Sequence, residues 1–390
     1  MPYRAFLIVG LWFVSACGSG GGGNGVVGPP PPNVLTVTVG GSSVCTNVDE
    51  VCTQVTICRP GTSVCQTISD ILVDTGSIGV RIFGSVLSIP LQQEIESPRH
   101  LVGECVSFVD GSALWGAVQL ADVVLAGEPA VTVPIHVIAP TFAGQSSSQN
   151  PCNSVVDSDP LMAGFNGILG IGLFTHDCGT ICEINDNNNL YFSCVASTCG
   201  SIVAPLSTQV QNPVWLLPSD KNGIVLTLPN VPAMGAPALS GSVTFGIGTA
   251  PNNSPPPGIS TFSTDQNGFL TTIYNGTTFA QSFIDTGSNG YFFPDSTLPV
   301  CPMPLQDFFC PPAAANLSAT LLGVNGRQAA VSFQVANTAT LIHTGNAVFN
   351  NLGGPSSTFD WGLPFFLGRV VVVGIEGQLS TLGTGPLYAF

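Results

Sequence analysis

The same acidic turn occurs twice in this chain. Residues 74–79 read DTGSIG and residues 285–290 read DTGSNG, 211 positions apart, in a sequence of 390 residues that contains only 22 Asp and Glu. Each copy follows an apolar run, DILV before the first and SFI before the second. A single D-x-G turn is a common structural element, because Asp and Gly both favour tight turns. Two nearly identical copies instead indicate an internal duplication, whose pseudo-twofold symmetry can bring the turns together.

The surroundings of the turn are duplicated as well. Each half contains an apolar strand, the D-T-G-S turn and, further along, a separate element of two apolar residues and a glycine. These elements are Ile168-Leu169-Gly170 in the first half and Phe366-Leu367-Gly368 in the second. The duplication predicts two pseudo-symmetric, barrel-like lobes with a central cleft, at residues 35–205 and 206–390.

Short β-branched runs bounded by Gly, Pro, Asn and Ser recur along the chain, whereas helical periodicity is hard to find. This pattern predicts an all-β fold. Short helices are expected in loops such as 85–95 and 201–211. The clearest predicted strands are residues 34–39, 51–57, 117–127, 130–139, 223–229, 241–248, 269–275, 329–336 and 369–375.

The repeated turn carries a specific chemistry if its two copies meet. Asp74 and Asp285 cannot both ionise freely at close range, so the pair would share one proton. The ionised carboxylate can then deprotonate a water molecule, while the protonated carboxyl hydrogen-bonds the scissile carbonyl and donates to the leaving amine. This mechanism requires no metal, no cofactor, no serine nucleophile and no covalent intermediate.

Several motifs, taken in order, resemble the bilobal, pepsin-like aspartic peptidases over roughly residues 35–390. They are the two D-T-G-S turns, the two apolar-apolar-Gly elements, SFVDGSALWGAVQLADVVLAG (107–127), which resembles the flap hairpin, and GSVTFGIG (241–248). Within this group the chain also resembles an uncharacterised family of bacterial exported proteins with lipoprotein-type signals, especially in VCQTISDILVDTGSIGVRIF and SGSVTFGIGT.

The resemblance implies a role for each residue of the two turns. Asp74 and Asp285 would be the catalytic dyad, and the hairpin tip would close over an extended peptide substrate. The supporting residues would be Thr75 and Thr286, cross-bracing the turns, Ser77 and Ser288, bonding the outer carboxylate oxygens, Gly76 and Gly287, allowing close approach, and the flap residues Phe108, Asp110 and Gly111.

The chain departs from the pepsin-like pattern at several positions. Phe108 replaces the flap Tyr, and the run SIGVRIF lacks the Trp that usually partners that Tyr. Arg81 is an unusual charge so close to the dyad, although a lone Arg more commonly points to solvent. Arg369 replaces an acidic residue of the family's L-G-D. These changes leave two alternatives open: an active endopeptidase, or a non-catalytic envelope protein that retains the scaffold for binding or structure, which the lack of a visible pro-segment also favours.

The N-terminus predicts export and lipid anchoring. Residues 1–17 place Arg4 before an apolar stretch that is too short to persist as a membrane-spanning helix. The VSAC ending resembles a bacterial lipobox with Cys17 as the lipidated residue; the alternative is an ordinary cleaved signal with Cys17 incidental. Residues 18–34, rich in Gly and Pro, would form a tether. Gly18 resembles the sorting pattern for an outer-membrane lipoprotein facing the periplasm or the cell surface.

The twelve cysteines that follow Cys17 predict up to six disulfides in an oxidising compartment. The most plausible local pairs are Cys58 with Cys65 and Cys301 with Cys310. Zinc binding by CGTIC and CVASTC is the weaker alternative, since neither is a CxxC pair.

Other sites are less well supported. The four His are scattered and no G-x-S-x-G motif is present, which disfavours Ser-His-Asp catalysis. Calcium binding by loop residues such as Asp157, Asp159, Asp177 and Asp186 lacks the EF-hand spacing. The net charge of −15 disfavours nucleic acid and anionic lipid as partners, so the membrane contact would be the lipid alone. Both aspartates come from one chain, so a monomer suffices.

Overall fold

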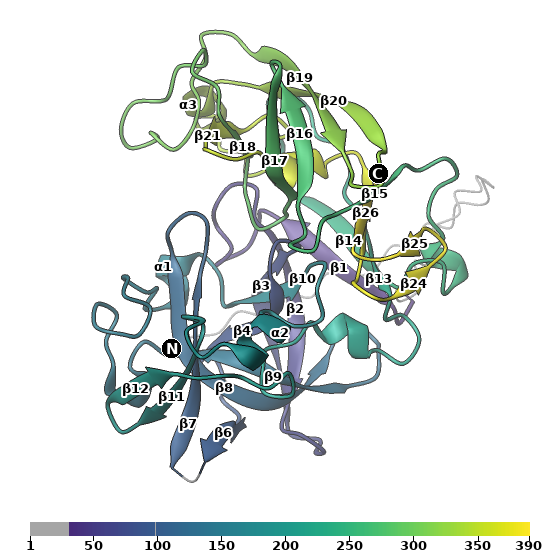
Figure 1. Cartoon of the computed structure of the whole chain (residues 1–390). Helices are drawn as coiled ribbons and strands as arrows, with labels where there is room; N and C mark the ends of the chain where they lie inside the picture. The colour runs from purple at the N-terminus through teal and green to yellow at the C-terminus, as the bar shows by residue number, and fades with distance from the viewer. Residues whose placement is uncertain (1–30, 98) are drawn as a thin grey trace, which may run out of the picture. The chain divides into compact units, whose positions relative to one another are not determined.

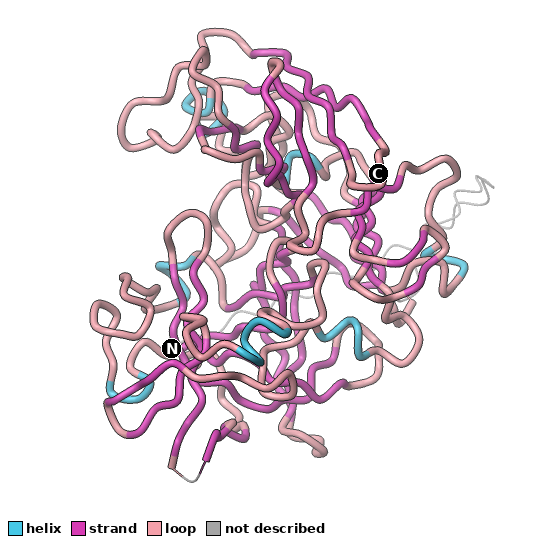
Figure 2. Tube along the Cα trace, in the orientation of Figure 1, coloured by secondary structure: helices cyan, strands magenta, loops and turns pink. Residues whose placement is uncertain are grey.

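Strands dominate the structure, as the β-branched runs predict. The computed structural model describes residues 31–97 and 99–390, and within these residues no α-helix is longer than five residues. All nine segments predicted above as strands contain one, and the first lies at Val34–Val39 as predicted (Figure 2). The all-β prediction is therefore confirmed. The export signal, Cys17 and residues 18–30 lie outside the described residues, and Pro31–Phe390 forms one compact unit.

Most strands belong to one hydrogen-bonded sheet that uses segments from both halves of the sequence (Figure 1). Its 17 strands are β1 (Val34–Val39), β2 (Val51–Cys58), β3 (Cys65–Asp74), β4 (Ile78–Phe83), β5 (Gln92–Gln93), β6 (Ile95–Ser97), β7 (His100–Ser107), β8 (Ala113–Val124), β9 (Val131–Ile138), β10 (Gly167–Ile171), β11 (Tyr191–Val195), β12 (Thr198–Ser201), β13 (Gly223–Thr227), β14 (Leu239–Phe245), β15 (Thr261–Ser263), β23 (Val370–Gly374) and β26 (Leu387–Ala389).

Six of these strands close into a barrel-like ring. Around the ring, β2 pairs with β3, β3 with β10, β10 with β4, β4 with β9, β9 with β8, and β8 again with β2. The β3–β10 and β4–β9 pairs are parallel and the others antiparallel. Closure leaves few unpaired strand edges, which stabilises an all-β protein against edge-to-edge association.

Strands from the second half of the sequence extend this sheet. β1 pairs along its whole length with β14, with Val34 opposite Thr244 and Val39 opposite Leu239. β14 pairs in turn with β13, β13 with β23, and β23 with β26. The first described strand is thus held by residues two hundred or more positions further along the chain.

The remaining strands form a seven-stranded sheet and a small ribbon. The seven strands run in the order β20-β19-β16-β17-β22-β18-β21. Their bounds, with those of the ribbon strands β24 and β25, are β16 (Leu270–Tyr274), β17 (Thr277–Ile284), β18 (Tyr291–Phe293), β19 (Ala315–Leu322), β20 (Gln328–Val335), β21 (Gly353–Pro355), β22 (Asp360–Trp361), β24 (Leu379–Ser380) and β25 (Gly383–Thr384).

The helices are short and lie outside the two loops where they were predicted. They are α1 (Pro160–Ala163), α2 (Thr180–Ile184), α3 (Thr338–Ile342) and the 3₁₀ turns η1 (Phe142–Gly144), η2 (Pro213–Leu216), η3 (Pro251–Asn253) and η4 (Leu363–Phe365). The prediction for 85–95 and 201–211 was wrong: these loops contain turns and short strands. Each contains a proline, Pro90 or Pro205, which cannot donate the backbone bond that a continuing helix needs.

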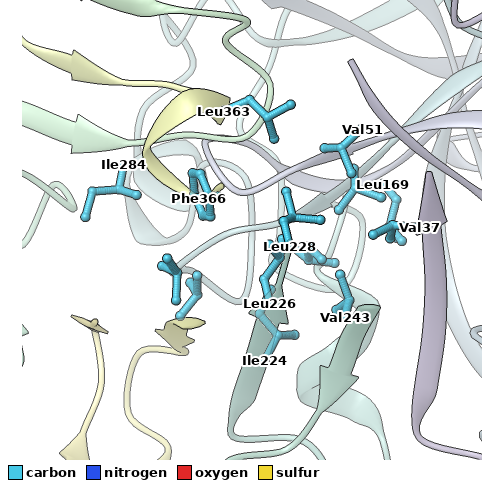
Figure 3. Close-up of a cluster of buried hydrophobic side chains, with 14 of the residues drawn as sticks. Val37, Val51, Leu169, Ile224, Leu226, Leu228, Val243, Ile284, Leu363 and Phe366 are labelled. Carbon is cyan, nitrogen blue, oxygen red and sulfur yellow. The ribbon is translucent and has the colours of Figure 1, made fainter. Parts of the chain in front are cut away.

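One apolar cluster joins the large sheet to the second sheet. Leu169 of β10, Ile284 of β17 and Leu363 of η4 all belong to it, together with Val37 and Val243 (Figure 3). Each of these side chains is essentially buried, and burial of a Val, Leu or Ile stabilises a fold by about 1.5–3 kcal/mol. Ile284 ends the strand that leads into the second turn, and Leu169 lies opposite Val73 of β3, which leads into the first, so this core holds both strands in place.

Six disulfides bind the loops of the described chain. Cys58–Cys65 and Cys301–Cys310 confirm the two predicted pairs. The others are Cys45–Cys52, Cys105–Cys152, Cys178–Cys182 and Cys194–Cys199, so all twelve cysteines after residue 30 are paired and none is left for zinc. This many disulfides indicates an extracellular or periplasmic location. In the described ranges no helix has the length and apolar character needed to cross a membrane.

Candidate active site

The first repeated turn is held between three strands. β3 ends at Asp74, and β10 runs parallel to it with Leu169 opposite Val73 and Gly170 opposite Asp74. β10 also pairs antiparallel with β4, which follows the turn, and places Gly170 opposite Gly79. A Cβ atom on Gly170 would lie 2.7 Å from the backbone nitrogen of Ile78, so only glycine fits beneath the turn.

The second turn is built in the same register. β17 ends at Ile284, and β22 runs parallel to it with Phe283 opposite Asp360 and Ile284 opposite Trp361. β22 also pairs antiparallel with β18, with Trp361 opposite Tyr291. A Cβ on Gly362 would lie 2.2 Å from the carbonyl oxygen of Gly290, which makes Gly362 the counterpart of Gly170.

This register corrects the second apolar-apolar-Gly element. The sequence predicted Phe366-Leu367-Gly368, but the segment beside the second turn is Asp360-Trp361-Gly362. Phe366 instead follows η4, and Leu367 forms an isolated bridge with Leu228. The comparison of Arg369 with the acidic residue of the family's L-G-D pattern assumed that Gly368 lies beside the second turn, so that comparison is wrong as well. The sequence search missed this segment because it required two apolar residues before the glycine, and the first of the two positions is occupied by Asp360.

Two threonines join the turns by reciprocal hydrogen bonds. The Thr75 backbone N–H donates to the Thr286 hydroxyl at 3.0 Å, and the Thr286 N–H donates to the Thr75 hydroxyl at 3.1 Å. Each hydroxyl then donates to the opposite strand, Thr286 to the carbonyl of Val73 at 2.7 Å and Thr75 to that of Ile284 at 3.3 Å. Both threonines are buried, so these four bonds are shielded from water and hold the turns in contact.

The two carboxyl groups face each other across the glycines of the turns. A Cβ on Gly76 would lie 2.6 Å from Cγ of Asp285, and one on Gly287 would lie 2.8 Å from Oδ1 of Asp74. A larger residue at either position would therefore separate the turns. The approach also has an electrostatic effect: burial, followed by the negative charges of Asp74 and Asp360 and a hydrogen bond with Asp74, raises the pKa of Asp285 well above its ordinary value.

Hydrogen bonding distinguishes the two carboxyl groups. Asp74 accepts three bonds, from the Gly76 N–H at 2.8 Å, the Ser77 N–H at 3.2 Å and the Ser77 hydroxyl at 2.5 Å. Asp285 accepts two, from the Gly287 N–H at 2.7 Å and the Ser288 hydroxyl at 2.9 Å. Donors stabilise a negative charge, so Asp74 is the better site for the charge and Asp285 for the shared proton. The geometry permits a proton-sharing pair, and its catalytic role stays a prediction.

The hairpin with the expected flap residues connects β7 to β8. The Phe108 N–H donates to the carbonyl of Ser112 at 2.9 Å, and Asp110 accepts a bond from the Ser112 N–H at 2.9 Å. Gly111 has a φ of 88°, which favours glycine. The half-buried Phe108 ring packs against the apolar cluster that contains Leu72, two residues before Asp74. The hairpin tip is therefore connected to the strand that carries the first carboxylate.

Arg81 does not point to solvent. Its side chain is 1% exposed, and its guanidinium pairs with Glu104 at 2.7 Å and with Asp177 at 3.4 Å. It also donates to the carbonyl of Ile78, directly after the first turn, at 2.5 Å. Tyr191 donates to Asp177 at 2.7 Å and completes this side of the cluster. The arginine at this position is thus a buried anchor for the first turn.

The protonation of this buried cluster follows from its charges. Burial, followed by the charge of Glu104, raises the pKa of Asp177 well above its ordinary value. Burial would also raise the pKa of Glu104, but the charges of Arg81 and then His136 lower it overall. Burial lowers the pKa of His136 to about 4, although Glu104 opposes this, so the imidazole is neutral at neutral pH. One arginine charge and one glutamate charge therefore balance in the interior.

The second turn has a buried carboxyl of its own in Asp360. Its side chain is 5% exposed, and its Oδ1 has no hydrogen-bond partner among the described residues. Burial raises the pKa of Asp360 to about 8; a hydrogen bond with Ser288 opposes the rise, and the charge of Asp74 adds to it. A third acid therefore lies beside the two repeated aspartates.

The chain matches a known family model over the whole of this site. The model of the family described as "Protein of unknown function (DUF3443)" matches residues 29–390. The chain belongs to this family. No curated protein matches it. The twin turns, the hairpin and Asp360 all lie in the part of this DUF3443 protein that the family model covers.

The other predicted sites do not assemble in this DUF3443 protein. Asp159 caps α1 by accepting the backbone N–H groups of Leu161 and Met162, and Asp177 belongs to the arginine cluster. Within residues 31–97 and 99–390, no group of three or more His, Cys, Asp and Glu is arranged to hold a metal ion.

Sequence reasoning missed Glu104, His136 and Asp360. The available signal was a charged or titratable residue inside an apolar strand, as in LVGECVSF and TFDWG. A buried charge requires a partner, so such an interruption indicates an interior polar contact even where the partner is unknown.

Proposed function

We propose that this protein is an aspartic endopeptidase of the pepsin-like type, anchored at the cell envelope by a lipid on Cys17. The observation that carries the proposal is the set of reciprocal Thr75–Thr286 hydrogen bonds, which bring two D-T-G-S turns into contact across 211 residues. A single turn needs no such partner. A buried Asp74 and a half-buried Asp285 held against each other are costly for stability, and a shared proton gives that arrangement a chemical use.

The asymmetry of the pair supports one assignment of the two roles. Asp74, with three hydrogen-bond donors, is the ionised base that takes a proton from a bound water molecule. Asp285 keeps its proton and donates a hydrogen bond to the scissile carbonyl oxygen. Attack of the water oxygen on the carbonyl carbon gives a tetrahedral intermediate. Its C–N bond then breaks as a proton passes from the dyad to the leaving nitrogen, which yields a carboxylic acid and an amine.

A non-catalytic binding or structural role is the second candidate. Phe108 lacks the hydroxyl of the usual flap tyrosine, and the buried Arg81 occupies the segment where the partnering tryptophan is expected. Both changes affect the hairpin and leave the two carboxyl groups intact. A scaffold retained for binding would tolerate loss of either aspartate, whereas a peptidase would not.

The test is cleavage of a diverse peptide library from acidic to neutral pH, with and without a transition-state mimic such as pepstatin. We expect wild-type protein to cleave peptides, and Asp74→Asn or Asp285→Asn to lower kcat at least about 1000-fold because each removes one partner of the shared proton. Asp186→Asn, in an exposed loop, is the matched control and should cleave as wild type does.

Folding of each variant is checked by denaturant unfolding. Equal cleavage by wild type and both dyad variants would show that any activity arises elsewhere. Peptide binding without cleavage, retained in the dyad variants, would support the binding role instead.

A further inference from the structure

We propose that the buried ion pair of Arg81 and Glu104 sets the position of the β7–β8 hairpin relative to the first turn, so that both are positioning residues of this site. Their use in binding a peptide rests on the proposed function, in which the hairpin covers the substrate. Neither residue belongs to a D-T-G-S turn, and they lie on different strands, Arg81 in β4 and Glu104 in β7.

The hairpin leaves the sheet at one pair of facing residues, Glu104 and Gly116. In β7, Glu104 is the last residue that also pairs with β11, where it lies opposite Tyr191. In β8, pairing with β9 begins at Gly116, which lies opposite Ile138. Beyond this pair, the register that the structure describes joins β7 and β8 only to each other. Glu104 therefore lies at the base of the hairpin.

Arg81 connects this base to the first turn. Its Nη2 donates to Oε1 of Glu104 at 2.7 Å, and its Nη1 donates to the carbonyl oxygen of Ile78 at 2.5 Å. Ile78 follows Ser77, whose N–H and hydroxyl both donate to Asp74. The guanidinium is a planar fork, so the two bonds hold the hairpin base and the residue after the turn at a fixed separation.

A second route joins the same two places through Tyr191, the residue opposite Glu104 in β11. The Tyr191 hydroxyl donates to Asp177 at 2.7 Å and accepts the N–H of Val210 at 2.7 Å. Val210 packs against the first turn, because a Cβ on Gly79 would lie 2.2 Å from its Cγ1. The hairpin base and the residues after the turn therefore belong to one buried network.

The frame of a repeated turn does not itself require a cation at this position. Arg81 lies opposite Ile168 beside the first turn, and the apolar Phe292 lies opposite Asp360 at the matching register beside the second. A buried ion pair adds little stability over well-packed apolar residues of similar size, whereas its geometry is specific. The presence of the pair only at the turn that faces the hairpin base indicates that it serves the hairpin.

A shift of the base would move the tip of the hairpin. At the tip, Phe108 packs against the apolar cluster that contains Leu72, and Val109 is 82% exposed. A segment that covers a substrate changes binding when its placement changes. Loss of the Arg81–Glu104 link should therefore weaken peptide binding more than it slows the chemical step, since the reciprocal threonine bonds still hold the two turns in contact.

The first test measures the hairpin directly and needs no peptide. Amide hydrogen exchange followed by mass spectrometry reports the local opening of residues 105–113. Leu321→Ala is the matched control, because it removes a buried side chain of β19 in the other sheet and lowers global stability. At urea concentrations that give both variants the same free energy of unfolding, Arg81→Met should exchange at least about tenfold faster in the hairpin. Equal exchange would overturn the inference.

The second test separates positioning from stability. Arg81→Met leaves the charge of Glu104 buried alone and should lower the urea midpoint, whereas Arg81→Met with Glu104→Leu removes both charges and should recover at least about half of that loss. The double variant still lacks the link to Ile78, so its KM should stay at least about fivefold above wild type, with kcat within about threefold. Glu104→Gln keeps an oxygen that accepts from Arg81 and should keep KM within about twofold of wild type.

The outcomes distinguish this inference from the proposed function. Wild-type cleavage with a KM that recovers in the double variant together with stability would overturn the positioning role and leave the peptidase proposal standing. A wild type that cleaves no peptide, with faster hairpin exchange in Arg81→Met than in Leu321→Ala, would overturn the peptidase proposal and leave the placement of the hairpin standing. No cleavage together with equal exchange would overturn both.

Discussion

The two repeated turns share one backbone and differ in what supports them. Both end a strand, both lie on a glycine that no other residue could replace, and each threonine bonds the other turn. Beneath the first turn lies a balanced ionic cluster around Arg81, and beneath the second a lone carboxyl, Asp360. The two turns share this hydrogen-bonded frame, whereas the side chains around them differ and give the two aspartates different electrostatic surroundings.

The largest difference between the turns is expected from the Arg81 cluster. Arg81→Met leaves Glu104 and Asp177 buried without their cation, and breaking a buried pair in this way costs about 3–5 kcal/mol. Phe292→Met, at the equivalent register of the second turn, removes contacts of a half-buried ring and should cost less than about 1.5 kcal/mol. Urea unfolding at neutral pH measures both. Equal costs would show that the cluster does not specifically support the first turn.

The reciprocal threonine bonds should contribute equally to both turns. Thr75→Val and Thr286→Val each leave one buried backbone N–H and one carbonyl without their hydroxyl partner, at about 1–3 kcal/mol for each group. We therefore expect losses of similar size from the two variants, and a double variant that loses less than their sum, because the bonds form one network. Thermal unfolding of the single and double variants is the measurement. A large loss of stability from only one of the two single variants would show that the two threonines contribute unequally to the contact.

The smallest expected effects come from the two serines, and they should differ. Ser77→Ala removes a donor to the charged Asp74 and should cost about 1.5–3 kcal/mol, whereas Ser288→Ala removes a bond between neutral groups and should cost about 0.5–1.5 kcal/mol. Denaturant unfolding of both variants at neutral pH measures the difference. A larger cost at Ser288 would reverse the assignment of charge and proton within the pair.

Much of the frame could be predicted from the sequence. The strand pattern follows from local β-branched runs and turn residues, and two disulfides follow from short spacing. The repeated D-T-G-S letters also pointed to contact between the turns, because a duplicated element implies symmetry. These features depend on residues near one another in the chain or on identity between its halves.

The supporting side chains could not be predicted in the same way. Arg81 finds its partners at Glu104 and Asp177, and Asp360 lies beside the second turn only through the register of β22 with β17. An isolated charged residue in a sequence is usually exposed, so the Arg81 side chain was expected to point to solvent. The register also shows which glycine lies beside the second turn. The sequence pattern predicted Gly368, because Asp360 occupies a position of the true segment, which ends in Gly362, where an apolar residue was required. Long-range register is the information that composition and local pattern lack.

The pairing of β1 with β14 has a consequence for how this protein is made. β1 pairs with β2 at only two positions but with β14 along its whole length, so most of its pairing must wait until the chain has been delivered as far as Thr244. Five of the six disulfides close loops of no more than nine residues and can form in the meantime. Contacts of such long sequence separation slow folding. Because Asp74 and Asp285 meet only in the finished structure, a nascent or truncated chain carries no assembled pair, and any hydrolytic activity is withheld until export is nearly complete.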